Sequence, residues 1–166
     1  MAGMQVVTTQ AGIGRVENDE IALLDTPFPH LGAVLQGAGS LDALGSAPVL
    51  RRVPLAAAVL VAPLGEPRAI WGIGLNYRDH AGDLNEQVPD EPASFIKGDH
   101  TIVGPNEPII LPQQSTRTTA EAELGLVIGR QCRDVDEGDA LDYVFGVFPL
   151  LDQTADDILH RNPRFL

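Results

Sequence analysis

One apolar segment that begins with two acidic residues constrains the fold of this chain most. Residues 118–130 read TTAEAELGLVIGR, in which Glu121 and Glu123 precede an apolar run with two β-branched residues, closed by Gly129. This composition predicts a buried β-strand. Because residues i and i+2 of a strand project from the same face, the two glutamate side chains should point the same way.

Two carboxylates side by side repel each other unless something neutralises them. A divalent cation does this well, and hard cations such as Mg²⁺ and Ca²⁺ take carboxylate oxygens as ligands. The alternative is that Glu121 and Glu123 are two solvated side chains at a strand end. Their spacing alone leaves both interpretations open.

Composition limits the partners and the compartment. The 166 residues carry 11 basic and 23 acidic side chains, a net charge of −12, so we expect neither nucleic acid nor an anionic membrane as a partner. Cys132 is the single cysteine, which excludes an internal disulfide and fits a reducing cytoplasm. The longest apolar run, residues 54–64, is too short to span a bilayer and is interrupted by prolines.

The chain divides best at residues 63–67, where two prolines and a glycine stop regular structure. We predict a small N-terminal α/β lobe over residues 1–64, with an antiparallel meander and a short helix, and a chemical domain over residues 65–166. A hydrophobic content of 44% is enough for a packed core. The strands expected in the second part are residues 69–74, 93–97, 109–112, 121–128 and 143–151, and a helix is expected to begin near Gln153.

A histidine and an acid follow the 69–74 strand. Asn76 is a suitable helix cap, and His80 and Asp83 are three residues apart, so on a helix they share a face. A carboxylate beside an imidazole orients the ring and raises its basicity, as general-base catalysis requires. The alternative is an ordinary surface pair.

Several segments, taken in order, resemble the fumarylacetoacetate hydrolase family. They are GLNYRDHA at 74–81, FIK at 95–97, EAELGLVIGR at 121–130, residues 139–146 and finally Asp152. The resemblance covers about residues 60–160. It implies a mixed α/β, strand-rich fold, a mixed β-roll of several short sheets with few helices, preceded here by the small N-terminal lobe.

The resemblance also implies a metal site and a base. Members of the family bind Mg²⁺, Mn²⁺ or Ca²⁺ through a Glu-x-Glu pair and a later aspartate, which here are Glu121, Glu123 and Asp152. The catalytic histidine is His80, and its orienting acid falls at Asp83, where the family usually has glutamate. Because that side chain is one methylene shorter, Glu86 is an alternative partner for the histidine.

Further site residues follow from the same resemblance. Lys97 would help to hold the oxyanion of the substrate, although it could also be a solvated strand end. Asp156 stands where the family often has arginine. The residues implied in substrate binding are Asn76, Tyr77 and Arg78.

The implied reaction is hydrolysis of a C–C bond in a 2-oxo acid or 1,3-dicarbonyl compound, such as an acylpyruvate, through an enolate stabilised by the metal. Decarboxylation, hydration or isomerisation of a 2-oxo acid would use the same site. A catalytically incomplete metal-binding fragment is a further possibility. A pure Ca²⁺-binding module would need more oxygen ligands than the sequence offers.

The end of the sequence sets a last expectation. Relatives usually continue past this point with a second lysine segment and a late Gly-Thr-Pro turn, and neither has a counterpart here. We therefore expect a C-terminally incomplete, cytoplasmic catalytic domain that acts on a small molecule. Alone, it should bind a divalent cation weakly, self-associate, with a homodimer as the expected assembly, and show little turnover.

Overall fold

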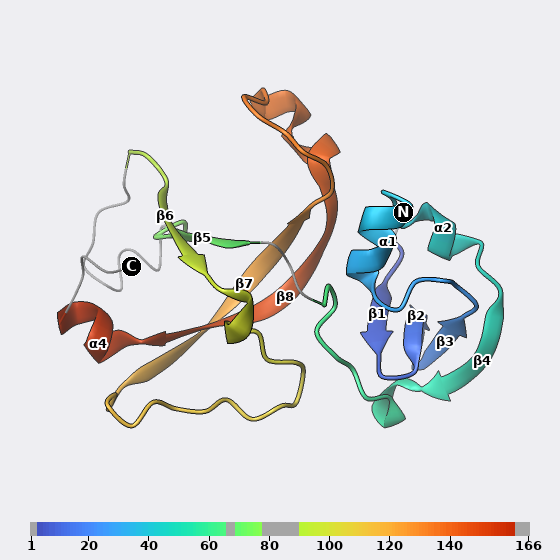
Figure 1. The fold of residues 1–166 in the computed structure, drawn as a ribbon, viewed down its shortest axis with the longest axis horizontal. Coiled ribbons are helices and arrows are strands. Elements are labelled where there is room, and N and C mark those ends of the chain that lie inside the picture. Colours follow the sequence, from blue (N-terminus) through green and yellow to red (C-terminus); the bar gives the residue numbers. More distant parts are fainter. Residues whose placement is uncertain (1–2, 66–68, 78–89, 162–166) are drawn as a thin grey trace.

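The computed structural model describes residues 3–65, 69–77 and 90–161. Its N-terminal part is an antiparallel four-stranded sheet in the order β1-β2-β3-β4, in which each strand pairs with the next in sequence. Two short helices lie between β3 and β4 along the chain, and a short 3-10 helix, η1, follows β4 (Figure 1). The bounds are β1 Val6–Thr9, β2 Gly12–Glu17, β3 Glu20–Leu24, α1 Leu31–Gly37, α2 Asp42–Gly45, β4 Val49–Pro54 and η1 Leu55–Ala57.

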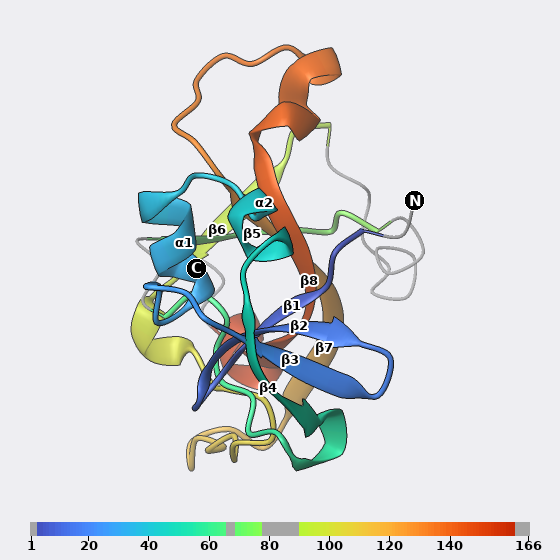
Figure 2. The same cartoon turned by 90° about the vertical axis from the view of Figure 1, so that its right-hand side faces the viewer.

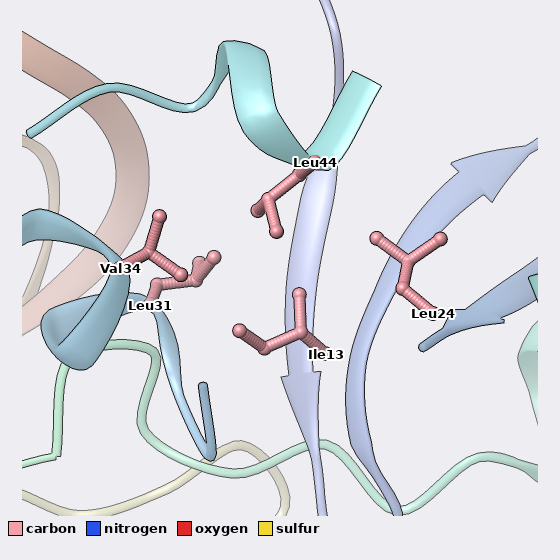
Figure 3. Packing of buried hydrophobic residues seen from close by; sticks show 5 residues of the cluster. All are labelled: Ile13, Leu24, Leu31, Val34 and Leu44. Carbon is pink, nitrogen blue, oxygen red and sulfur yellow. The ribbon is translucent and has the colours of Figure 1, made fainter. Parts of the chain in front are cut away.

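The sheet and the two helices enclose a small aliphatic core. Ile13 from β2 and Leu24 from β3 face side chains from α1 and α2, and the five side chains point toward one another (Figure 3). Val34 and Leu44 are 0% and 1% exposed, so the two short helices are held by packing rather than by helix propensity. Phe145, from the second part of the chain, packs against the same cluster.

The second part consists of two separate antiparallel pairs, β5-β6 and β7-β8. The second pair is much the longer and forms a curved two-stranded ribbon in both views (Figures 1 and 2). Each residue of β7 from Thr118 to Val127 has a register partner in β8. The bounds are β5 Ile70–Gly74, β6 Ala93–Lys97, η2 Asp99–Thr101, β7 Thr118–Ile128, η3 Glu137–Tyr143, β8 Val144–Ala155 and α4 Asp156–Arg161.

Each of these two sheets has an inner and an outer face. On the inner faces a phenylalanine lies opposite a glycine: Phe95 is the partner of Gly72, and Phe148 is the partner of Gly125. A Cβ atom at Gly125 would come within 2.6 Å of the Phe148 ring, so only glycine leaves room for the ring there. The close cover by phenylalanine is the packing by which an aromatic ring compensates for a glycine in a strand.

The outer faces carry large apolar side chains that are exposed. They alternate with the half-buried residues, as expected for strands that are covered on one side only. The buried strand predicted at 121–128 is therefore half-buried in this structure. The outer-face side chains at least 50% exposed are Trp71, Ile73, Ile96, Leu124, Leu126, Ile128, Val147 and Leu151.

Two predictions about local structure were wrong. The strand expected to end at Leu151 continues to Ala155, because β7 begins at Thr118 and the ladder between the strands extends to the Thr118–Ala155 pair. The helix consequently begins at Asp156. Residues 109–112 form no strand: prolines stand at positions 108 and 112, and the segment has no partner in any ladder of the described residues.

The mixed α/β, strand-rich class is confirmed. The predicted division at residues 64 and 65 stays a prediction, although Leu64 packs on the N-terminal core and β5 begins only at Ile70. Within the described residues, no helix is long and apolar enough to cross a membrane.

The Asp157 carboxylate helps to join the start of α4 to the loop before β7. Asp157 accepts hydrogen bonds from the Ser115 hydroxyl at 2.6 Å and from the Thr116 amide at 3.1 Å, and Arg161 lies 3.5 Å away. These donors, the Ser115 hydroxyl first, lower the pKa of Asp157 from 3.8 to about 2. Because the folded-state pKa is depressed, the contribution of Asp157 to stability is complete above about pH 4 and is lost as the pH falls through about 2.

This sign leads to a pH prediction. Asp157→Asn should lower the melting temperature at pH 5, and the difference from the parent protein should shrink as the pH falls from about 4 toward 2. Thermal melts across that range measure the difference. The control is Asp134→Asn, whose exposed carboxylate contacts only the neighbouring Arg133 among the described residues. A difference between Asp157→Asn and parent that does not depend on pH would contradict the prediction.

Candidate functional site

The candidate site lies on the inner face of the β7-β8 ribbon. Glu121 and Glu123 are two residues apart on β7, and both are half-buried while the residues between and around them are exposed. Asp152 on β8 is the direct register partner of Glu121. Because paired residues of an antiparallel ladder project from the same face, the structure brings all three carboxylates to one side of the ribbon.

The ladder geometry also explains why these carboxylates are shielded. Leu150 is the partner of Glu123, and Phe148 covers Gly125 next along the same face. Apolar side chains therefore lie beside the carboxylates, on the side toward the segment that connects β7 to β8. Glu121 additionally accepts a long hydrogen bond of 3.4 Å from the Thr119 hydroxyl.

Lys97 reaches this face from the other sheet. It is the last residue of β6, and its Nζ atom contacts the Asp152 carboxylate and donates a hydrogen bond of 2.8 Å to the backbone oxygen of Gln153. The ammonium also lies 5.9 Å from the centre of the Phe95 ring. The alternative of a solvated strand end does not describe this side chain, which is 29% exposed and bound at both of these oxygens.

The donor set can be compared with what a metal ion requires. Three carboxylates on one half-buried face are the oxygen ligands that Mg²⁺ and Mn²⁺ prefer, so the residues fit such an ion in chemistry. Among the residues that the structure describes, however, no three acidic, histidine or cysteine side chains lie close enough together to hold one. Their convergence on a cation therefore stays a prediction.

Tyr77 lies near one of these carboxylates, that of Glu123. It lines an open hollow of about 460 Å³ together with Glu123, Leu150 and Phe148. Asn76 precedes it as an exposed residue, and Leu75 has a left-handed backbone with φ of 54°. Such a conformation costs a leucine roughly 1–3 kcal/mol, and it turns the chain sharply at the end of β5 just before the predicted substrate-binding residues.

The remaining predicted residues lie outside the described part of the chain. These are the predicted base, its two alternative acidic partners and one predicted substrate-binding residue: His80, Asp83, Glu86 and Arg78. Their roles stay predictions. The alternative of a surface His80–Asp83 pair stays open for the same reason.

Gln153 is a site residue that the sequence reasoning missed. Its backbone oxygen accepts from Lys97, and its side-chain Nε2 atom is buried without a hydrogen-bond partner. A buried donor without a partner lowers the stability of a protein by about 1–3 kcal/mol. The sequence placed Gln153 at a helix start. Residues 152–154 are all polar, so no alternation of apolar and polar residues continues past Leu151 that could have placed Gln153 in a strand.

Comparison with known proteins identifies the family. The family model described as "Fumarylacetoacetate (FAA) hydrolase C-terminal" matches residues 69–165, which is more than half of the chain. The chain belongs to the fumarylacetoacetate hydrolase family. The match includes the β5-β6 and β7-β8 sheets and hence all three carboxylates of the candidate site.

Members of the fumarylacetoacetate hydrolase family also share the fold. The fumarylacetoacetate hydrolase of psychrophilic Exiguobacterium antarcticum has a TM-score of 0.78 and 28% identity, over 99% of this chain and 61% of its own. The 5-carboxymethyl-2-hydroxymuconate delta-isomerase of Mycobacterium smegmatis has a TM-score of 0.66 and 26% identity, over 98% and 59%. The maleylpyruvate hydrolase of Sphingobium sp. SYK-6, in complex with manganese(II) and pyruvate, has a TM-score of 0.65 and 29% identity, over 91% and 59%.

Among curated sequences, a proposed hydrolase of Burkholderia ambifaria is 46% identical over 114 residues. That alignment covers 63% of this chain and 40% of the relative. The chain therefore spans less than two thirds of the length of the relatives and solved structures that it matches.

Proposed function

We propose that this chain carries the metal-holding face of an enzyme that hydrolyses a C–C bond in an acylpyruvate-like 2-oxo acid. The observation that carries the proposal is the placement of Glu121, Glu123 and Asp152 on one face of one ribbon. Membership of the family and the likeness to a maleylpyruvate hydrolase that holds manganese(II) and pyruvate support it.

The three carboxylates would hold a divalent cation, Mg²⁺, Mn²⁺ or Ca²⁺. When bound, such a cation supplies positive charge next to the substrate oxygens on which negative charge develops in the transition state. Tyr77, beside Glu123, would contact the substrate at the edge of this face. Lys97, whose ammonium lies at Asp152, would hold a substrate oxygen that becomes negative.

His80 would supply the proton transfer. As general base it takes a proton from a water molecule, whose oxygen adds to the distal carbonyl carbon of the substrate. The C–C bond then breaks, its electron pair remains on the carbon next to the 2-oxo group, and that carbon takes up a proton. The products are a carboxylic acid and a shorter 2-oxo acid, with Asp83 or Glu86 holding the imidazole in position.

Isomerisation is the second candidate, because an isomerase shares this fold at 26% identity. Isomerisation, decarboxylation and hydration each need a similar stabilised carbanion next to a 2-oxo group. A turnover screen with Mn²⁺ and Mg²⁺ over acylpyruvates, oxaloacetate and 2-oxo-alkenoates separates these reactions by their products. We expect slow acylpyruvate cleavage that stops when EDTA is added. Turnover of another substrate class alone would replace hydrolysis by that reaction.

The role of the base has its own test. His80→Ala should lower kcat by roughly 10²–10⁴-fold, the range for loss of a general base, and should leave Mn²⁺ affinity nearly unchanged because His80 is not a ligand. Steady-state kinetics and calorimetric titration of Mn²⁺ measure the two effects separately. His100→Ala is the matched control, since that histidine is exposed and lies beyond the end of β6. Full activity in the His80→Ala protein would exclude the base role.

A further inference from the structure

Lys97 is the only lysine in the sequence. The other ten of the 11 basic residues are arginines. A compact ammonium is thus placed once in the chain, at the end of β6, where it contacts Asp152. An ammonium is a point charge without the planar fork of a guanidinium. It can therefore move from a carboxylate oxygen to another partner without breaking a bidentate pair.

The contact joins two sheets that share no strand pairing among the described residues. Among the described residues, the side-chain hydrogen bonds between β5-β6 and β7-β8 are the two that Lys97 makes, to the Asp152 carboxylate and to the Gln153 backbone oxygen. Lys97 and Asp152 are 29% and 20% exposed, so water screens their attraction only partly.

The same ammonium offsets one of the three negative charges on the inner face. Asp152 pairs in register with Glu121, which stands two residues from Glu123, so Lys97 provides positive charge where a divalent cation would provide it. The ammonium contacts Oδ1 of Asp152, and a metal ion held by the three carboxylates would bring a second positive charge to the same carboxylate, so the two cations repel each other there.

We propose that Lys97 is the internal counter-ion of the carboxylate face and competes with the metal ion for Asp152. Metal binding displaces the Lys97 ammonium from Asp152, and the ammonium is then free to contact the substrate. This inference rests on the proposed function, because it requires the three carboxylates to be the metal ligands. It adds that the metal affinity of this chain is lowered by its own lysine, and that metal binding loosens a connection between two sheets.

Metal affinity provides the first test. Calorimetric titration of EDTA-treated protein with Mn²⁺ alone should show that Lys97→Met binds about 10-fold more tightly than the parent, the scale of one lost charge-assisted hydrogen bond. Lys97→Arg, which keeps the charge, should bind no more tightly than the parent. Arg117→Met is the matched control: it removes a cation beside the start of β7 that pairs with Asp156 rather than Asp152, and it should change the affinity little. Circular dichroism shows whether each variant is folded.

The single lysine permits a second readout that does not depend on affinity. An amine-reactive reagent can modify only Lys97 and the N-terminal amine, so mass spectrometry of the Lys97 peptide follows one side chain. The modification rate of the parent protein should rise several-fold when Mn²⁺ is added, because the ammonium leaves its half-buried position at Asp152. The N-terminal amine is the internal reference, and its rate should stay constant.

The outcomes separate this inference from the proposed function. Mn²⁺ binding that is unchanged or weaker in Lys97→Met, with no rise in Lys97 modification, would overturn the competition while leaving the metal site in place. Failure of Mn²⁺ to bind either the parent or Lys97→Met would overturn both proposals. Tighter binding in Lys97→Met and in Arg117→Met alike would show a general effect of charge and would also overturn the competition.

Discussion

Replacing Glu121 and Glu123 together by glutamine should weaken Mn²⁺ binding at least about 100-fold, an effect larger than the 10–100-fold that is typical when only a supporting residue is lost. Glutamine keeps the shape of each side chain but removes both negative charges, so Asp152 would be the remaining charged ligand of the predicted set. Calorimetric titration with Mn²⁺ measures the change. The double variant should fold, because removing two like charges from one face relieves repulsion.

The control must change the net charge equally. Glu137→Gln with Asp139→Asn removes two exposed acidic groups from η3, outside the carboxylate face. Its Mn²⁺ affinity should stay within about twofold of the parent, because exposed charges more than a Debye length of about 10 Å apart are largely screened. Equal losses in the two double variants would mean that Mn²⁺ is held by the general negative charge and not by a site.

The second large effect concerns the outer faces of the two sheets in the second part. We expect the chain to scatter light as a species heavier than the 17.7 kDa of one copy. Within the part of the chain that the structure describes, the buried hydrophobic core residues all lie between Ile13 and Leu44, whereas the β7-β8 ribbon exposes leucines along its outer face. An isolated two-stranded ribbon is marginally stable, and contiguous exposed apolar surface drives association.

Two glutamates on the outer face should reverse this association. Leu126→Glu with Leu151→Glu places charges on side chains that are 55% and 60% exposed, and it should shift the scattering mass toward one copy at the same concentration. The matched control is Leu50→Glu with Val59→Glu, at side chains 66% and 55% exposed in the N-terminal part. A parent protein that is monomeric at every concentration would show that the outer faces need no cover.

The periodicity of the sequence was sufficient to predict that the two glutamates share a strand face, but not to predict which residues lie opposite them. A period of two is a local property, so the prediction that Glu121 and Glu123 share a face of a strand is confirmed by their half-burial between exposed neighbours. Which residue of β8 lies opposite Glu121 depends on register. The loop of residues 129–143 separates the two strands, and no local pattern specifies the pairing across it.

Contacts between the two sheets could not be predicted from local sequence patterns. Lys97 could be placed at a strand end from its sequence, but its contact with Asp152 depends on how β6 lies relative to β8, 55 residues away. The extension of β8 through Gln153 was missed because acidic residues at 156 and 157 favour a helix start, and that signal was assigned three residues too early. The roles of His80, Asp83 and Arg78 stay predictions from the resemblance, since these residues lie outside the described part.

The register of the β7-β8 ribbon limits how this protein can vary in length. Its irregularity lies between Val127 and Ile128, close to the connecting loop, and pairing is regular from there back to Thr118. Residues inserted or deleted between 129 and 143 can be absorbed beyond that irregularity, and the carboxylates would stay where they are. One residue deleted between the irregularity and Glu123 would instead shift every pair by one and turn Glu121 to the face opposite Asp152. The loop is thus free to vary in length, whereas the four residues 124–127 between Glu123 and the irregularity are fixed in number.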